Sequence, residues 1–134
     1  MTSASLLNNW PHRWFGYFSQ SGYVATKLPS LDEVTDPGWT PADRAKLCDY
    51  LKRAPVTVTS FERDHKCSLC GAEIGNPTAH QSDGLWLWPL CLPHFVEFHS
   101  VRLPDSLVAR IRGQRYRIPC NLDIDHASLE WPPS

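Results

Sequence analysis

The chain has little that would carry it across or onto a membrane. It contains no apolar run long enough to span a bilayer, and its first residues, MTSASLLNNWPHRW, lack the basic start and the apolar stretch of a secretory signal. Its formal net charge is only -1, so no overall field draws it to nucleic acid or anionic lipid. We therefore expect a cytoplasmic protein without a membrane partner.

The common catalytic zinc motifs are also missing. The zincin pattern HExxH does not occur, and Glu97, which follows His94 in an HxxE pattern, stands in the wrong order relative to the CxxC for a deaminase. An HNH-type nuclease is a remote alternative because His80 lies between two groups of metal-binding residues, but no Asp-His pair accompanies it. We therefore expect no enzymatic activity.

Length and composition indicate one folded domain. The chain has 134 residues, 42% hydrophobic and 20% charged, which is typical of globular proteins. We expect a single α+β domain over residues 1–134, with a zinc-binding core at about 61–112 and a loosely packed tail at about 120–134. The aromatic-rich segment 10–23 is expected to bury its rings, since a small domain needs large side chains in its core.

Periodicity and turn residues predict most of the secondary structure. Thr40, Pro41 and Asp43 are typical of a helix start, and a Pro at the end of the apolar stripe stops that helix. Alternating β-branched residues predict a strand in PVTVTSF. The expected elements are helices at 41–53, about 92–99 and 105–112, strands at 55–61 and 85–88, an edge strand at 115–119, and a loop at 27–39.

The cysteines point to metal binding more than to disulfides. There are five, an odd number, and Cys67, Cys70 and Cys91 lie in one stretch while Cys48 and Cys120 stand apart. Two thiolates separated by two residues can hold one tetrahedral ion in a tight turn. Such a turn needs a flexible residue, and glycine follows the second cysteine directly.

Two ligand sets complete the coordination of a structural Zn²⁺ ion. Cys67 and Cys70 can combine with His94 and His99, as in a ββα zinc finger with a long insertion. Alternatively, Cys91 replaces His99, which pairs CxxC with CxxH as in a treble clef. A start of the helix near residue 92 favours Cys91, so the residues alone leave the fourth ligand open.

The block CSLCGAEIGNPTAHQSDGLWLWPLCLPHFVEFHSVRLPDSLVARI resembles a family of small bacterial proteins. Their shared pattern is CxxCG, then DG with an aromatic strand, then WPxxLxHYVxxHxVRLP and a final helix. The match runs from Cys67 to about Ile111. The resemblance implies a zinc-binding fold with His94 and His99 as ligands, and it brings no established activity. Leu90, Cys91 and Pro93 depart from the family pattern, which keeps Cys91 in question.

By elimination, the expected function is non-catalytic binding of another protein, and an immunity or antitoxin-like protein is the concrete hypothesis. Exposed Trp or Arg side chains would anchor the partner. The alternative is nucleic-acid binding through the basic segment Arg110–Arg117, where Tyr116 could stack on a base. The candidate partner-binding residues are Arg102, Arg112, Arg115, Arg117, Trp39 and Trp131.

Overall fold

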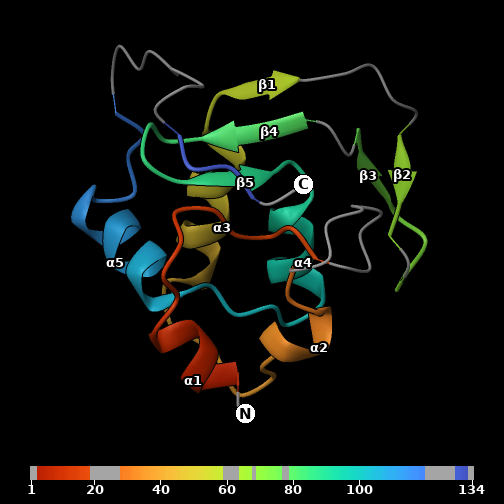
Figure 1. Ribbon diagram of the computed structural model, residues 1–134, viewed down its shortest axis with the longest axis horizontal. Helices are drawn as coiled ribbons and strands as arrows, with labels where there is room; N and C mark the ends of the chain where they lie inside the picture. Colours follow the sequence, from red (N-terminus) through yellow and green to blue (C-terminus); the bar gives the residue numbers. More distant parts are fainter. Residues whose placement is uncertain are drawn as a thin grey trace.

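The computed structural model describes residues 3–18, 28–58, 64–67, 69–76, 79–119 and 129–132, and all structural statements concern these residues. Five helices and two small antiparallel sheets form a mixed architecture, so the predicted α+β class is confirmed (Figure 1). The elements are α1 (Ser3–Asn8), α2 (Leu31–Val34), α3 (Arg44–Arg53), β1 (Val56–Val58), β2 (His65–Lys66), β3 (Glu73–Gly75), β4 (Ala79–Ser82), β5 (Leu87–Pro89), α4 (Leu92–Phe98) and α5 (Asp105–Gly113).

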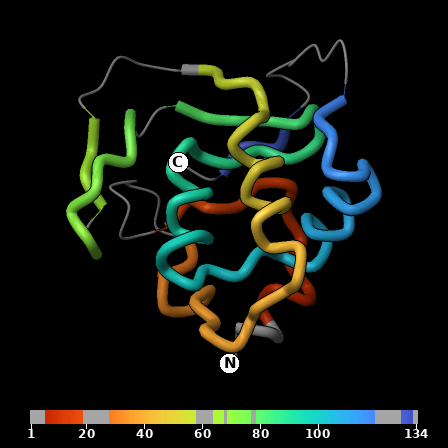
Figure 2. The backbone as a smooth tube through the Cα atoms, turned by 180° about the vertical axis from the view of Figure 1, so that it is seen from behind, coloured from red at the N-terminus to blue at the C-terminus, as the bar shows by residue number. Residues whose placement is uncertain are grey.

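The larger sheet has the order β1-β4-β5, and the smaller one is the hairpin β2-β3. From behind, α3 crosses in front of the larger sheet, and the hairpin lies at the side of the molecule, beyond α4 (Figure 2). The segment after α1 extends the larger sheet through an isolated bridge between Trp14 and Leu87. The hairpin is thus peripheral to the larger sheet and its helices.

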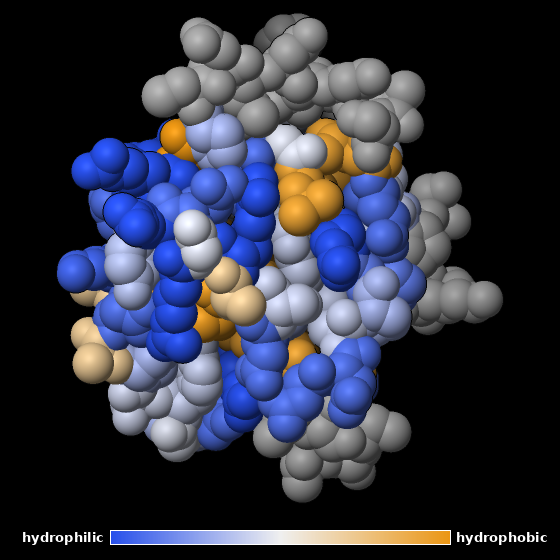
Figure 3. Space-filling view, turned by 90° about the vertical axis from the view of Figure 1, so that its left-hand side faces the viewer, coloured by the Kyte–Doolittle hydropathy of each residue, from blue (hydrophilic) through white to orange (hydrophobic). Residues whose placement is uncertain are grey.

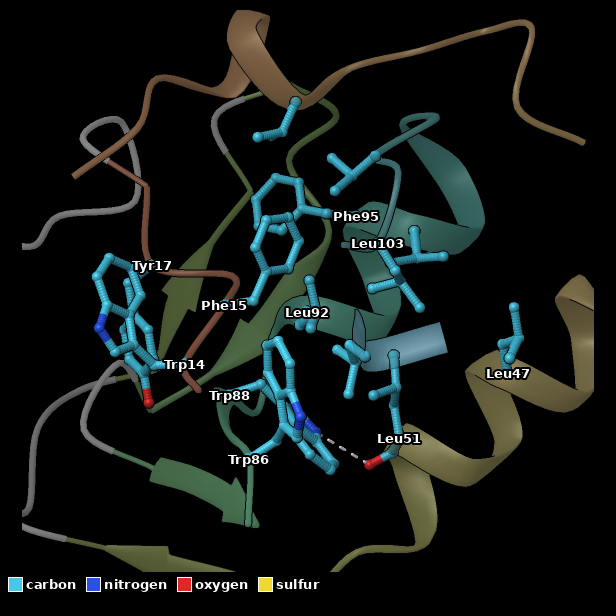
Figure 4. Packing of buried hydrophobic residues seen from close by; sticks show 14 of the residues in the cluster. Trp14, Phe15, Tyr17, Leu47, Leu51, Trp86, Trp88, Leu92, Phe95 and Leu103 are labelled. Carbon is cyan, nitrogen blue, oxygen red and sulfur yellow. Dashed lines mark hydrogen bonds between the residues drawn. The ribbon is translucent and has the colours of Figure 1, made fainter. Parts of the chain in front are cut away.

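The core is rich in aromatic rings, as predicted for the N-terminal segment. Trp14, Phe15 and Tyr17 are almost completely buried, as are Trp86 and Trp88 of the same core (Figure 4). The Trp88 indole N–H donates to the Leu51 carbonyl at 3.3 Å, which ties α3 to β5. Residues 19–23 of the predicted aromatic segment lie outside the described residues.

Three local expectations differ from the structure. The predicted loop at 27–39 contains the short helix α2, where the Glu33 carboxylate accepts a hydrogen bond from the Ser30 N–H at 3.1 Å. The helix expected at 41–53 begins only at Arg44, because the residues before it form a turn. The expected edge strand at 115–119 is a turn followed by irregular chain, with positive φ at Arg115 and Tyr116.

A buried carboxylate ties α3 and α5 to the turn before β5. Asp83 is completely buried and accepts from the Tyr50 hydroxyl at 2.5 Å and from the Arg110 Nε at 3.2 Å. Its other oxygen accepts from the backbone N–H groups of Leu85 and Trp86 at 3.0 and 2.8 Å. Burial, together with the bond to Asp83, raises the pKa of Tyr50, so the phenol remains a hydrogen-bond donor.

The described part of the C-terminal tail packs against the domain. Leu129 is buried, and the Glu130 carboxylate accepts from the Arg13 N–H at 3.2 Å and lies 2.7 Å from His12 Nδ1. The expectation of loose packing therefore does not hold for residues 129–132, and residues 120–128 lie outside the described residues. No helix in the described ranges combines the length and apolarity needed to cross a membrane.

Candidate metal centre

The CxxC forms a tight turn between β2 and β3. The Gly71 N–H donates to the Cys67 carbonyl at 2.8 Å, and the Cys67 N–H donates to the Ala72 carbonyl at 2.7 Å. Gly71 has a φ of 75°, a conformation that is costly for residues with a Cβ. The Leu69 N–H points at the Cys67 sulfur at 3.4 Å. The turn therefore presents both sulfurs on one side of the hairpin.

The two histidines come from opposite ends of α4. Pro93 lies in the first turn of this helix, where its missing N–H costs nothing. Leu92, Phe95 and Val96 are buried, which fixes the helix on the core. His94 follows in the first turn, while His99 is the C-cap residue and donates its backbone N–H to the Phe95 carbonyl at 3.0 Å.

Four ligand atoms, one each from Cys67, Cys70, His94 and His99, lie within 4.8 Å of one another and could hold a metal ion. The Cys67 sulfur is 3.4 Å from His99 Nε2, and the Cys70 sulfur is 3.4 Å from His94 Nε2. The two Nε2 atoms are 3.2 Å apart. A tetrahedral zinc ion has edges of roughly 3.5 Å between sulfur and nitrogen and roughly 3.3 Å between two nitrogens. These three distances match the corresponding edges of that tetrahedron, and the other pairs of ligand atoms lie within 4.8 Å.

Cys91 is not a member of this group of four ligand atoms. It is the N-cap residue of α4 and is only 7% exposed. Burial raises the pKa of its thiol to about 12, so the side chain is protonated and not in the thiolate form that binds metal. The structure thus brings together the ligand set that contains His99.

The site lies at the surface, since Cys67 is buried, Cys70 is exposed and both histidines are half-buried. Burial, and then the neighbouring His99, lowers the pKa of His94, which favours the neutral imidazole that a metal needs. The Phe98 ring lies 5.2 Å from the His94 ring and is 66% exposed. Phe98 is thus an exposed aromatic side chain beside the site.

Much of the hairpin is exposed to solvent among the residues that the structure describes. Asp64, His65 and Lys66 are exposed, as are the residues from Leu69 to Glu73. Cys67 is the buried residue of the CxxC turn, and Ile74 in β3 is half-buried. An ion bound to the four ligands would therefore link the hairpin to α4, in addition to the packing of Ile74 against the core.

The remaining candidate residues are less available than expected. Arg102 is 15% exposed in its side chain, and it donates to Asp36 and Asp105, each at 3.2 Å. Trp39 and Trp131 are half-buried and pack against the core, so neither is the exposed anchor that the sequence suggested. These three residues stabilise the domain in the described structure.

Only some of the arginine side chains in the segment Arg110–Arg117 are available to a partner. Arg112 makes two hydrogen bonds of 2.9 Å to the Asp43 carboxylate, which also accepts from the Tyr116 hydroxyl at 2.6 Å. Arg115 and Arg117 are exposed. The side of the molecule that carries α5 is largely hydrophilic, with small apolar areas (Figure 3). This surface is polar, but part of its positive charge is neutralised within the domain.

The Asp43 pair predicts a pH dependence of stability. The bonds from Arg112 first, and from Tyr116, hold the pKa of Asp43 well below its usual range. The unfolded chain takes up this proton near pH 3.9, and the native state does so only at lower pH. The stability that Asp43 contributes is thus complete at neutral pH and decreases as the pH falls below about 4.

Urea unfolding of the wild type and of Asp43→Asn between pH 7 and pH 3 measures this effect. We expect the difference in free energy of unfolding to shrink toward acid, because Asp43 of the wild type loses its charge there and comes to resemble the asparagine of the variant. Loss of metal as the histidines protonate affects both proteins equally, so it cancels in this difference. A constant difference across this range would show that the Asp43 contacts are not linked to its charge.

Two other histidines of the described ranges, His65 and His80, lie outside the group of metal ligands. His80 is 7% exposed, and its Nδ1 lies 2.7 Å from the Tyr17 hydroxyl. Its ring contacts the Trp131 ring at 5.2 Å. His65 is an exposed residue of β2. His80, the residue on which the nuclease alternative depends, therefore faces the core.

Comparison of the chain with known protein families, with curated proteins and with solved structures gives no match. The assignment of the site accordingly depends on its geometry and on the chemistry of its ligands.

Two variants test the ligand set directly. We expect Cys91→Ser to retain one metal ion per chain, because the Cys91 sulfur is outside the group of four. His99→Ala should lower the metal content below one, because three protein ligands bind the ion less tightly than four. Elemental analysis of both proteins after gel filtration gives the measurement. The reverse pattern would establish Cys91 as the fourth ligand.

Proposed function

We propose that Cys67, Cys70, His94 and His99 hold one structural zinc ion. The observation that carries this proposal is the gathering of the four ligand atoms within 4.8 Å of one another, with two sulfur–nitrogen distances and one nitrogen–nitrogen distance that match the edges of a zinc tetrahedron. Two sulfurs and two imidazole nitrogens form a ligand set that suits zinc. Since the protein supplies all four ligands, no coordination position remains for water or substrate, as is typical of a structural site.

Within the α+β fold, the arrangement favours a ββα finger with an insertion over a treble clef. A hairpin carries the two cysteines, and α4 carries one histidine in its first turn and one at its C-cap. A treble clef would take both later ligands from the start of the helix. Strands β4 and β5 then form the insertion between hairpin and helix.

We further propose that the domain is a non-catalytic module that binds another protein. The closed coordination supports a structural ion. Leu69, within the CxxC turn, and Phe98, whose ring contacts His94, expose 55% and 66% of their surface. Large exposed apolar side chains beside a rigid site are typical of interaction surfaces. An immunity or antitoxin-like protein, which caps a bacterial toxin, is the concrete form of this proposal.

Co-expression with a toxin tests the proposal that the protein is an immunity or antitoxin-like protein. If a toxin gene lies next to the gene for this protein, the wild type should restore growth of cells that express the toxin, and Cys70→Ser should not. Rescue by wild type and variant alike would contradict a role for the metal.

Heparin retention tests the nucleic-acid alternative, because phosphate contacts make binding depend on salt. We expect weak retention, since Arg102 and Arg112 are already paired with acidic residues. Strong retention that is lost when Arg112, Arg115 and Arg117 become alanine would favour nucleic acid over a protein partner.

A further inference from the structure

The structure assigns a docking groove beside the metal centre. We propose that the groove between β3 and α4 binds a segment of a partner protein in which a bulky apolar side chain is flanked by a lysine or arginine. This inference rests on the proposed function, because it names the surface and the partner chemistry of that interaction module.

The groove has a volume of about 390 Å³. This is within the range of about 300–1,000 Å³ that is typical of ligand sites. Its walls include Ile74 of β3, Leu90 in the connection to α4, and Pro93 and Phe98 of α4. Phe98 leaves 66% of its surface to solvent, so covering it would remove apolar area from water. These side chains suit one or two large apolar side chains of a partner.

The charged residues that line the groove favour a partner segment that contains a lysine or arginine. Glu73 and Glu97 contribute two carboxylates, and Lys52 contributes one ammonium group. Lys52 already pairs with Glu97 at 2.8 Å. Glu73 is exposed, and no hydrogen bond or ion pair engages its carboxylate among the described residues. The local charge is therefore net negative, and a lysine or arginine beside the apolar anchor complements it.

The metal links the two walls of this groove. Cys67 and Cys70 belong to the hairpin that contains β3, whereas His94 and His99 belong to α4. His94 itself lines the groove, and its ring contacts Phe98. Because much of the hairpin is exposed, a bound ion would help to fix the distance between the walls. The groove should accordingly lose its shape when the metal is removed.

A display library of random nine-residue peptides, selected on the zinc-loaded wild type, tests the proposal. We expect the enriched peptides to share a Leu, Phe or Trp next to a Lys or Arg, and to bind with dissociation constants in the micromolar range. Phe98→Ala and Glu73→Lys should each weaken binding at least tenfold. Both residues are exposed, so their variants should keep the wild-type melting temperature and zinc content.

Leu85→Ala provides the matched control, because Leu85 is 43% exposed and is not among the residues that line the groove. It should bind the selected peptides like the wild type. The groove assignment would be overturned if no peptide were enriched, if acidic peptides were enriched, or if Phe98→Ala bound the peptides as well as the wild type does. In each case, a zinc content of one ion per chain would show that the structural metal site is still correct. Purified protein without zinc would instead refute the proposed function.

Discussion

Cys70→Ser is expected to purify with less than one zinc ion per chain and to melt more than about 10 °C below the wild type. A structural zinc site can contribute on the order of 10 kcal/mol to folding. For a domain of this size, each 1 kcal/mol corresponds to roughly 4 °C in melting temperature. Because the larger sheet and its helices have their own core, part of the native structure should survive without metal.

Hydrogen exchange would locate the effect. Loss of the ion should expose the backbone amides of residues 64–67 and 69–76 and of the His99 end of α4, while α3, β4 and the buried start of α4 retain their protection. Lys66→Ala is the matched control, since Lys66 is an exposed neighbour of Cys67 in the same hairpin. It should keep the zinc and the melting temperature of the wild type. A Cys70→Ser protein that behaves like this control would refute the metal centre.

Asp83→Ala should lower the free energy of unfolding by about 3–5 kcal/mol, the usual result of removing one partner from a buried ion pair. The substitution leaves the buried Tyr50 hydroxyl and the half-buried Arg110 without their carboxylate acceptor. The Leu85 and Trp86 amides lose their acceptor as well. Urea unfolding of the zinc-loaded proteins measures the change.

Asp49→Ala serves as the comparison for this experiment. Asp49 pairs with Arg53 on the surface of α3, and its side chain is 63% exposed. Such exposed pairs contribute about 0–1 kcal/mol, so its removal should have little effect. If Asp83→Ala and Asp49→Ala lowered the free energy of unfolding by the same amount, the Asp83 hydrogen bonds would not be the link between α3, α5 and the turn before β5.

The sequence predicts those parts of the molecule whose signals are local. Pro93 and the apolar residues that follow specify α4, and the CxxC spacing with Gly71 specifies the turn that holds two sulfurs. The choice between Cys91 and His99 could not be made in this way. It depends on which face of α4 meets the hairpin, and that is set by packing over residues distant in sequence.

Strand β4 is a second feature that could not be predicted from local sequence signals. Its residues, AHQS, are mostly polar and follow a turn-rich stretch, yet all four are buried. The Gln81 side-chain amide donates to the carbonyls of Lys52 and Ala54 at 3.1 and 3.0 Å, at the end of α3. Such partners are supplied by the tertiary fold, so hydrophobic periodicity cannot reveal this strand.

The chain positions of the ligands have a consequence for how the domain folds. Cys67 and Cys70 precede β4 and β5, and His94 and His99 follow them, so a bound ion closes a loop that contains both strands. Such a closure reduces the conformational entropy of the disordered chain, as a disulfide does. Zinc ligation does so without oxidation, and the cross-link would therefore persist where thiols are kept reduced.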